Sequence, residues 1–186
     1  MPPTASPAVS AHETPSLEYS TSAEVPAEAM PVVTASEPVA LYDRRPSLGE
    51  KIGTITLESL DLSWPIFEGT EDAQLAKGVG HYRKSVLPGV EDNTILSGHR
   101  STVFNRLGEL KKNDLIYVKT KAGVFTYRVR GFRVVDRSDR TVIMPTETAV
   151  LTLTTCYPFN HIGITTDAFI VTADLIESAL KPTSTK

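Results

Sequence analysis

Cys156 is the only cysteine of the 186-residue chain, and its thiolate would be the strongest nucleophile available. Residues 151–156 alternate as a strand with one face in the core, which puts Cys156 on the same face as Thr152 and Thr154. Pro158 cannot donate to a strand ladder, so the predicted strand ends just after the thiol. A lone cysteine is more often an inert core residue than a nucleophile, so its interpretation depends on its partners.

A cysteine nucleophile needs a proton partner, because a thiol of ordinary pKa, about 8.5, is only a few per cent ionised at neutral pH. The chain has 4 histidines. His99 follows a predicted strand and a glycine, where scaffolds tend to present functional side chains, and we prefer it to His161. His81 has the context of a packing or loop histidine, and His12 lies in the N-terminal tail.

Other chemistries fit the sequence less well. Cys156 and His161 lack a second pair of ligands at zinc-binding spacing, so we expect no metal site and no cofactor. The sequence contains no glycine-rich phosphate loop and no Gly-x-Ser-x-Gly motif. Six acids against two arginines give residues 1–45 a net charge of −4, and the chain's total of −3 leaves about +1 for the rest. A nearly neutral domain argues against nucleic acid as a partner.

The composition divides the chain into three parts. Residues 1–47 are rich in Pro, Ala, Ser and Thr and lack periodicity, so we predict a disordered spacer. Residues 48–178 have the patterning of one folded domain, and residues 179–186 are predicted to be a flexible tail. No apolar run reaches the ~18 to 20 residues of a membrane span, and no signal peptide is recognisable.

The folded part is predicted to be an all-β barrel or sandwich with one or two short helices, because short β-prone runs alternate with turn residues. Thr70 is the expected N-cap of the first helix. The expected helices cover residues 71–76 and 101–110, and the expected strands cover residues 52–57, 60–67, 93–99, 115–118, 123–135, 141–144, 149–156 and 168–176.

Two motifs together identify a family resemblance. The run Leu151–Phe159 resembles the Thr-Leu-x-Thr-Cys signature of sortases, the cysteine transpeptidases of bacterial surfaces. Ser97-Gly98-His99-Arg100, followed by Thr102-Val103-Phe104, resembles their histidine motif. The resemblance covers roughly residues 48–177, and the Cys-Tyr-Pro-Phe ending is most similar to class D, the group associated with spore-forming Gram-positive bacteria.

The resemblance implies an eight-stranded β-barrel with catalytic Cys156 and His99 at strand ends, flanked by Gly98, Thr154 and Thr155. Cys156 would attack the Thr carbonyl of an LPxTG-like sorting signal on a surface protein, and the acyl group would pass to an amine of a peptidoglycan precursor. Sortases usually stand on the outer face of the cell membrane behind an N-terminal anchor. We therefore expect residues 1–47 to be a spacer from which such an anchor has been removed.

The sequence departs from the family pattern at two positions. Ala168 occupies the place of the family's arginine, which steadies the substrate and the developing oxyanion, and Ser101 stands where aspartate is usual. Three explanations stay open for Ala168: a deliberate arginine-to-alanine change, a natural enzyme with another donor, or a degenerate sortase that binds without turnover. We expect impaired activity. The competing functions are a β-barrel that only binds a sorting peptide or a partner protein, and a hydrolase that releases the acyl group to water.

Overall fold

The computed structural model describes residues 40–161 and 163–181, so the predicted spacer and C-terminal tail lie largely outside the described residues. The described part contains β1 (Lys51–Leu57), β2 (Leu62–Glu68), β3 (Val79–His81), β4 (Asn93–Ser97), β5 (Leu115–Thr120), β6 (Gly123–Asp136), β7 (Val150–Tyr157) and β8 (Asp167–Leu180). Its helical elements are short: α1 (Asp72–Leu75), η1 (Glu58–Leu60), η2 (Leu107–Glu109) and η3 (Arg140–Ile143).

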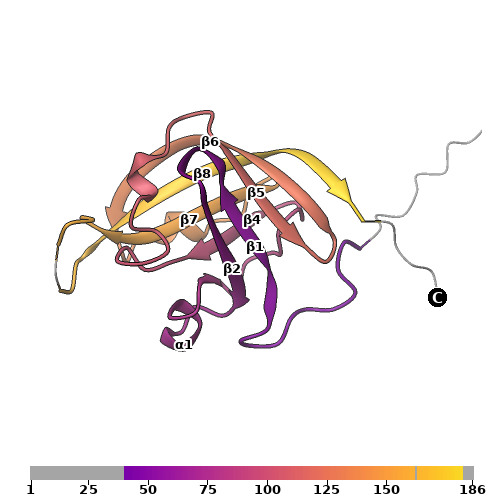
Figure 1. Cartoon of the computed structure of the whole chain (residues 1–186), viewed down its shortest axis with the longest axis horizontal. Coiled ribbons are helices and arrows are strands. Elements are labelled where there is room, and N and C mark those ends of the chain that lie inside the picture. The colour runs from indigo at the N-terminus through magenta and orange to yellow at the C-terminus, as the bar shows by residue number, and fades with distance from the viewer. Residues whose placement is uncertain (1–39, 162, 182–186) are drawn as a thin grey trace, which may run out of the picture. The chain divides into compact units, whose positions relative to one another are not determined.

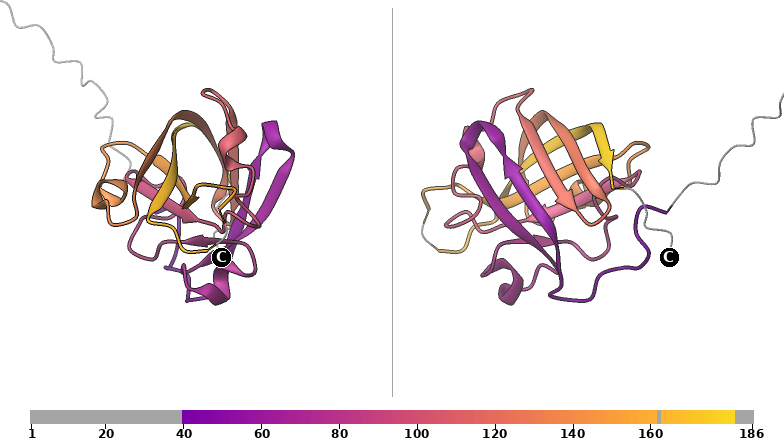
Figure 2. Two further views of the ribbon diagram at one scale, coloured as in Figure 1. Left: turned by 90° about the vertical axis from the view of Figure 1, so that its left-hand side faces the viewer. Right: turned by 45° about the vertical axis from the view of Figure 1, so that its right-hand side comes forward.

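The strands close into one barrel in the order β1-β2-β3-β4-β7-β8-β6-β5 (Figures 1 and 2). This confirms the predicted eight-stranded β-barrel with little helix. β7 lies between β4, to which it is parallel, and β8, to which it is antiparallel. Most other neighbours are antiparallel, including β1 and β2.

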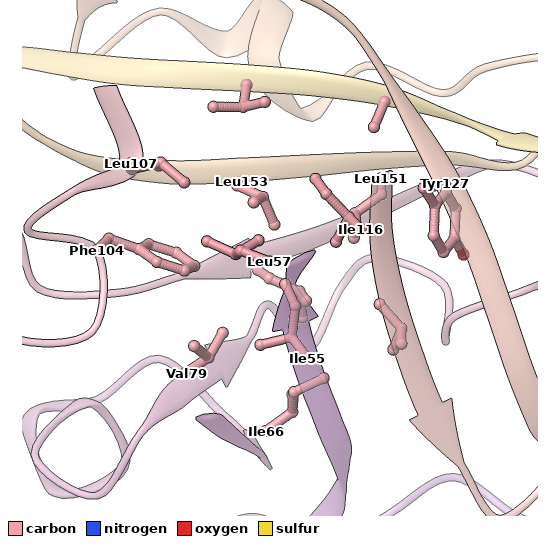
Figure 3. Close-up of a cluster of buried hydrophobic side chains, with 14 of the residues drawn as sticks. Ile55, Leu57, Ile66, Val79, Phe104, Leu107, Ile116, Tyr127, Leu151 and Leu153 are labelled. Carbon is pink, nitrogen blue, oxygen red and sulfur yellow. The ribbon is translucent and has the colours of Figure 1, made fainter. Parts of the chain in front are cut away.

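The barrel interior is filled by aliphatic and aromatic side chains (Figure 3). Leu151 and Leu153 of β7 are fully buried in it, whereas Cys156 is half-buried, so the alternation predicted for this strand is confirmed. Phe104 and Leu107, from the segment after β4, are also fully buried and close one end of the core. Because this segment is anchored in the core, the residues just before it have a fixed position.

Two local predictions are wrong. Residues 141–144 are β-prone, yet they lie in and beside η3, where the Asp139 carboxylate caps the turn by accepting from the Thr141 N–H at 2.8 Å. Residues 101–110 form turns and then η2 instead of one helix, because the N–H groups of Thr102 and Phe104 both bond the carbonyl of His99.

Two smaller features also differ from expectation. The first turn of α1 begins after Glu71 without a side-chain cap, so Thr70 is not the N-cap. β3 was missed because it is three residues long and glycine-flanked. Gly80 is required in it, since a Cβ there would lie 2.5 Å from the carbonyl oxygen of Gly69.

Candidate active site

The two residues expected to do chemistry stand at the same end of neighbouring strands. The last β4–β7 pair is Ser97 with Thr154, and His99 and Cys156 each follow two residues later. Adjacent strands lie about 4.8 Å apart, so the parallel pairing places the ends of β4 and β7 next to each other. On the other side of β7, Cys156 pairs with Ala168 of β8. Positions 156 and 168 are therefore level across β7 and β8, and position 99 lies two residues beyond the end of β4. We refer to these three positions as one row.

Gly98 fixes the backbone that carries His99. Its N–H donates to the carbonyl of Thr154 at 3.1 Å, and its own carbonyl accepts from the buried hydroxyl of Thr155 at 2.7 Å. A Cβ at Gly98 would lie 2.5 Å from a methyl group of Val103, so only glycine fits. The three residues predicted to flank the site, Gly98, Thr154 and Thr155, are thus joined to one another by hydrogen bonds.

Arg100 connects the histidine segment to the loop between β7 and β8, which lies at the left of Figure 1. Its guanidinium donates to the carbonyls of His161 and Gly163, both at 2.7 Å, and to the Thr165 hydroxyl at 3.0 Å. Charge-assisted bonds of this length are among the stronger hydrogen bonds in proteins. Arg100 appeared in the sequence only as part of the histidine motif, and nothing in the local pattern predicted these contacts.

Position 168 holds a small, buried side chain. Ala168 is 8% exposed and offers no hydrogen-bond donor beyond its backbone. Arg100, which follows His99, is hydrogen-bonded to the β7–β8 loop. No arginine occurs from Thr141 to the end of the chain. The row of His99, Cys156 and Ala168 therefore contains an imidazole and a thiol without a guanidinium on β8.

The sequence of this barrel matches the family description "Sortase domain" over residues 55–176. The chain belongs to the sortase family. Over 128 residues it is 39% identical to sortase D of Bacillus subtilis (strain 168), a match that covers 68% of this chain and 65% of that protein. It is 31% identical over 109 residues to sortase A of Listeria monocytogenes, covering 56% of this chain and 49% of the relative.

Solved structures of sortases have the same barrel. A Clostridium perfringens sortase D5 transpeptidase is 27% identical with a TM-score of 0.65, and the match covers 72% of this chain and 83% of that one. Sortase C from Clostridium perfringens SM101 is 28% identical with a TM-score of 0.64, covering 70% and 72%. In this sortase, the helices among residues 40–161 and 163–181 are all too short or too polar to cross a bilayer.

A cavity of about 320 Å³ opens on the outer face of β7 and β8, the face that also carries Cys156. Its floor is made by Val150 and Thr152 of β7 with Ile170 and Thr172 of β8. One wall is β6 at residues 130–133, and the other is the loop at residues 141–146. Sequence reasoning left the lining of this groove open, because β6 and β8 meet through a register that no local pattern reveals.

The other histidines lie outside this row. His81 is fully buried, with Nδ1 2.6 Å from Oε2 of Glu68 and Nε2 2.9 Å from the carbonyl of Val86. Both ring nitrogens have protein partners, so we assign His81 a structural role, in line with its predicted packing. The side chain of His161 is exposed, and its carbonyl is held by Arg100. His12 lies outside the described residues.

Proposed function

We propose that this chain is a cysteine transpeptidase of the sortase D type that acts on LPxTG-like sorting signals. The observation that carries the proposal is the row formed by His99 after β4, Cys156 on β7 and position 168 on β8, on the strands whose outer face also holds the cavity. An extended peptide lying along this face would bring its Thr carbonyl to the thiol. Cys156 is half-buried and therefore within reach of a substrate.

In the first step, the Cys156 thiolate forms an S–C bond to the Thr carbonyl carbon and a tetrahedral intermediate results. The C–N bond to the following residue then breaks, and His99 protonates the leaving amine. In the second step, an amine of a cell-wall precursor gives its proton to His99, attacks the thioester and releases the thiolate. Covalent catalysis divides the amide exchange into two acyl transfers, and general acid–base catalysis typically contributes ~10² to 10⁴-fold.

Ala168 makes this activity slow. Loss of one oxyanion donor typically costs ~10² to 10³ in rate, because the negative charge of the tetrahedral intermediate is then less stabilised. The cavity itself does not depend on residue 168, which is not among its lining residues. Peptide binding is therefore retained while acylation is impaired.

The test is intact-mass spectrometry of the chain after incubation with an LPxTG-like peptide, beside the variant Ala168→Arg. An acyl adduct forms ~10² to 10³ times faster in the variant if position 168 is the missing oxyanion donor. Cys156→Ala in the same background abolishes the adduct, and His99→Ala slows it without lowering the unfolding temperature. Absence of any adduct in Ala168→Arg across several sorting motifs would refute the enzymatic proposal.

A barrel that only binds a sorting peptide or partner protein is the second candidate, and the lack of a guanidinium at position 168 favours it. Alkylation of native Cys156 separates the two, because rapid labelling requires an accessible thiol whereas protection until unfolding indicates a structural one. Product analysis with and without an added amine separates transfer from hydrolysis. The partners proposed are surface proteins with a C-terminal sorting signal and a peptidoglycan amine, at the outer face of the cell membrane behind an N-terminal anchor.

A further inference from the structure

The outer-face cavity has a one-sided charge. Among the described residues that line it, only Arg130 and Arg133 of β6 are charged, and none is acidic. The rest of the lining is apolar or carries neutral hydroxyl and amide groups, with Phe132, Met144 and Ile170 among the apolar members. A peptide segment that is mostly apolar and carries one negative charge is therefore the chemical complement of this cavity.

The two arginines differ in how far they are neutralised. Arg130 forms an ion pair with Asp174, with NH1 and Oδ1 3.0 Å apart. Arg133 donates to the neutral hydroxyl of Thr141 at 3.3 Å. Among residues 40–161 and 163–181, no carboxylate oxygen lies within ion-pair distance of Arg133. Of the two cavity arginines, Arg133 is therefore the one whose guanidinium is available to pair with an acidic group of a ligand.

One acid lies near enough to compete. The pKa of Asp139 is lowered mainly by its hydrogen bonds with the backbone N–H and side chain of Thr141, and Arg133 adds a smaller Coulombic contribution. The Asp139 carboxylate is already occupied as the cap of η3, where it accepts from the Thr141 N–H. It attracts Arg133 without forming an ion pair with it.

The strand register gives the position of Arg133 relative to the thiol. Arg133 pairs with Ile170 of β8, and Ile170 pairs with Thr154 of β7. Arg133 is therefore level with the residue two before Cys156, which corresponds to about 6.6 Å along the strands. Across the sheet, Arg133 is two strands from β7, about 9.6 Å away. Its long side chain can therefore extend over β8 toward a peptide residue next to the attacked Thr and not to the thiol itself.

We propose that Arg133 is a specificity-determining residue that binds an acidic side chain, Glu or Asp, at the variable position x of the sorting peptide. The inference rests on the proposed function for the direction in which the peptide lies. It adds a substrate preference that the thiol and histidine do not set. The ion pair would form beside Ile170 and Met144, which line the same cavity.

The test measures binding of two fluorescent peptides, Leu-Pro-Glu-Thr-Gly and Leu-Pro-Gln-Thr-Gly, to the chain as it stands. Glu and Gln have the same shape, so the difference reports charge alone. We expect the Glu peptide to bind about 2- to 5-fold tighter at low salt, the range for an exposed ion pair. Arg133→Met brings this ratio close to 1, whereas the matched control Arg140→Met, which removes a charge from neighbouring η3 and not from the lining, preserves it.

Asp139→Asn sharpens the test. Asparagine caps a helical turn about as well as aspartate, so η3 keeps its cap while the competing charge disappears, and the Glu preference increases. An equal Glu-to-Gln ratio in the parent and in Arg133→Met overturns the proposal, as does failure to bind either peptide. The proposed function is tested separately by acylation. If Ala168→Arg is acylated equally by both peptides, the proposed function stands and the role of Arg133 is refuted. A Glu preference without acylation of Ala168→Arg would support the role of Arg133 and refute the enzymatic proposal.

Discussion

Two histidines in neighbouring parts of this barrel, one in β3 and one just after β4, have opposite surroundings. His81 of β3 is fully buried, and its ring nitrogens contact Glu68 and the carbonyl of Val86. His99, which follows β4, is half-buried, and within residues 40–161 and 163–181 no protein group bonds its ring. The first ring has every partner that it needs from the fold. The second is held only through its backbone, so its nitrogens stay available to a substrate.

The comparison teaches that the role of a histidine is indicated less by its neighbours in sequence than by whether its ring nitrogens already have hydrogen-bond partners. Both residues follow a glycine, as Gly80-His81 and Gly98-His99. Arg45 and Arg83 lie 3.9 and 4.0 Å from Oε1 of Glu68, so the buried carboxylate beside His81 is surrounded by positive charge. A group in such a network contributes to stability, and one left unsaturated beside a cysteine contributes to chemistry.

The largest effect is expected from breaking the buried pair. Glu68→Ala leaves the buried Nδ1 of His81 without a partner, so the free energy of unfolding falls by about 3 kcal/mol or more. Urea unfolding measures this loss. The matched control is Glu109→Ala, which removes the exposed 2.7 Å pair with Arg106 and costs far less, because exposed ion pairs contribute little to stability. Equal losses of unfolding free energy in the two variants would contradict the structural role assigned to the fully hydrogen-bonded His81.

Sequence reasoning reached the parts of this site that depend on local patterns. The alternation of β7 predicted which face Cys156 occupies. The position of His99 after a strand and a glycine made it the preferred proton partner, and that role stays a prediction. Sequence reasoning missed β3 and assigned a strand to residues 141–144, because the partners of these segments come from distant parts of the chain. Arg133 was missed for the same reason: its place beside the cavity is set by the β6–β8 register, and a charged residue in an exposed strand carries no local signal.

The contacts of Arg100 test the His99 side of the comparison. Arg100→Met removes three hydrogen bonds to the β7–β8 loop, so the loop that runs from the thiol to position 168 is less firmly fixed relative to His99. We expect the acylation rate of the Ala168→Arg background to fall about 10-fold, which corresponds to ~1.4 kcal/mol of lost positioning. Pre-steady-state mass spectrometry gives this rate, and urea unfolding checks stability.

Arg100→Lys distinguishes positioning from a general loss of charge. Lysine keeps the charge but cannot offer the guanidinium fork to two carbonyls and a hydroxyl, so only part of the rate returns. The expected result is a change in acylation rate with little change in peptide affinity. A loss of stability that matches the loss of rate would instead make Arg100 a structural residue like His81.

The smallest effect concerns alkaline pH and the segment before β1. Tyr42 donates to the carbonyl of Pro88 at 2.7 Å and lies 3.1 Å from the Thr120 hydroxyl. Burial raises its pKa to about 12, against a small opposing contribution from the hydrogen bond with Thr120. Because the pKa in the folded state lies above the value of about 10 in the unfolded chain, the neutral phenol stabilises the fold fully below pH 10. That contribution is lost as the pH rises from 10 to 12.

Urea unfolding at a series of pH values measures this loss directly. Burial also raises the pKa of Tyr127, so the parent chain has two tyrosines that contribute to the alkaline decline. Tyr42→Phe removes one of them: the variant loses about 1 kcal/mol at neutral pH through the missing hydrogen bonds, and its stability then falls less steeply above pH 10. Alkylation of Cys156 serves as the readout at the other site. If the segment around Tyr42 acts on stability alone, the labelling rate of Cys156 at pH 7 is the same in Tyr42→Phe and in the parent. A changed rate would mean that this segment is coupled to the thiol site.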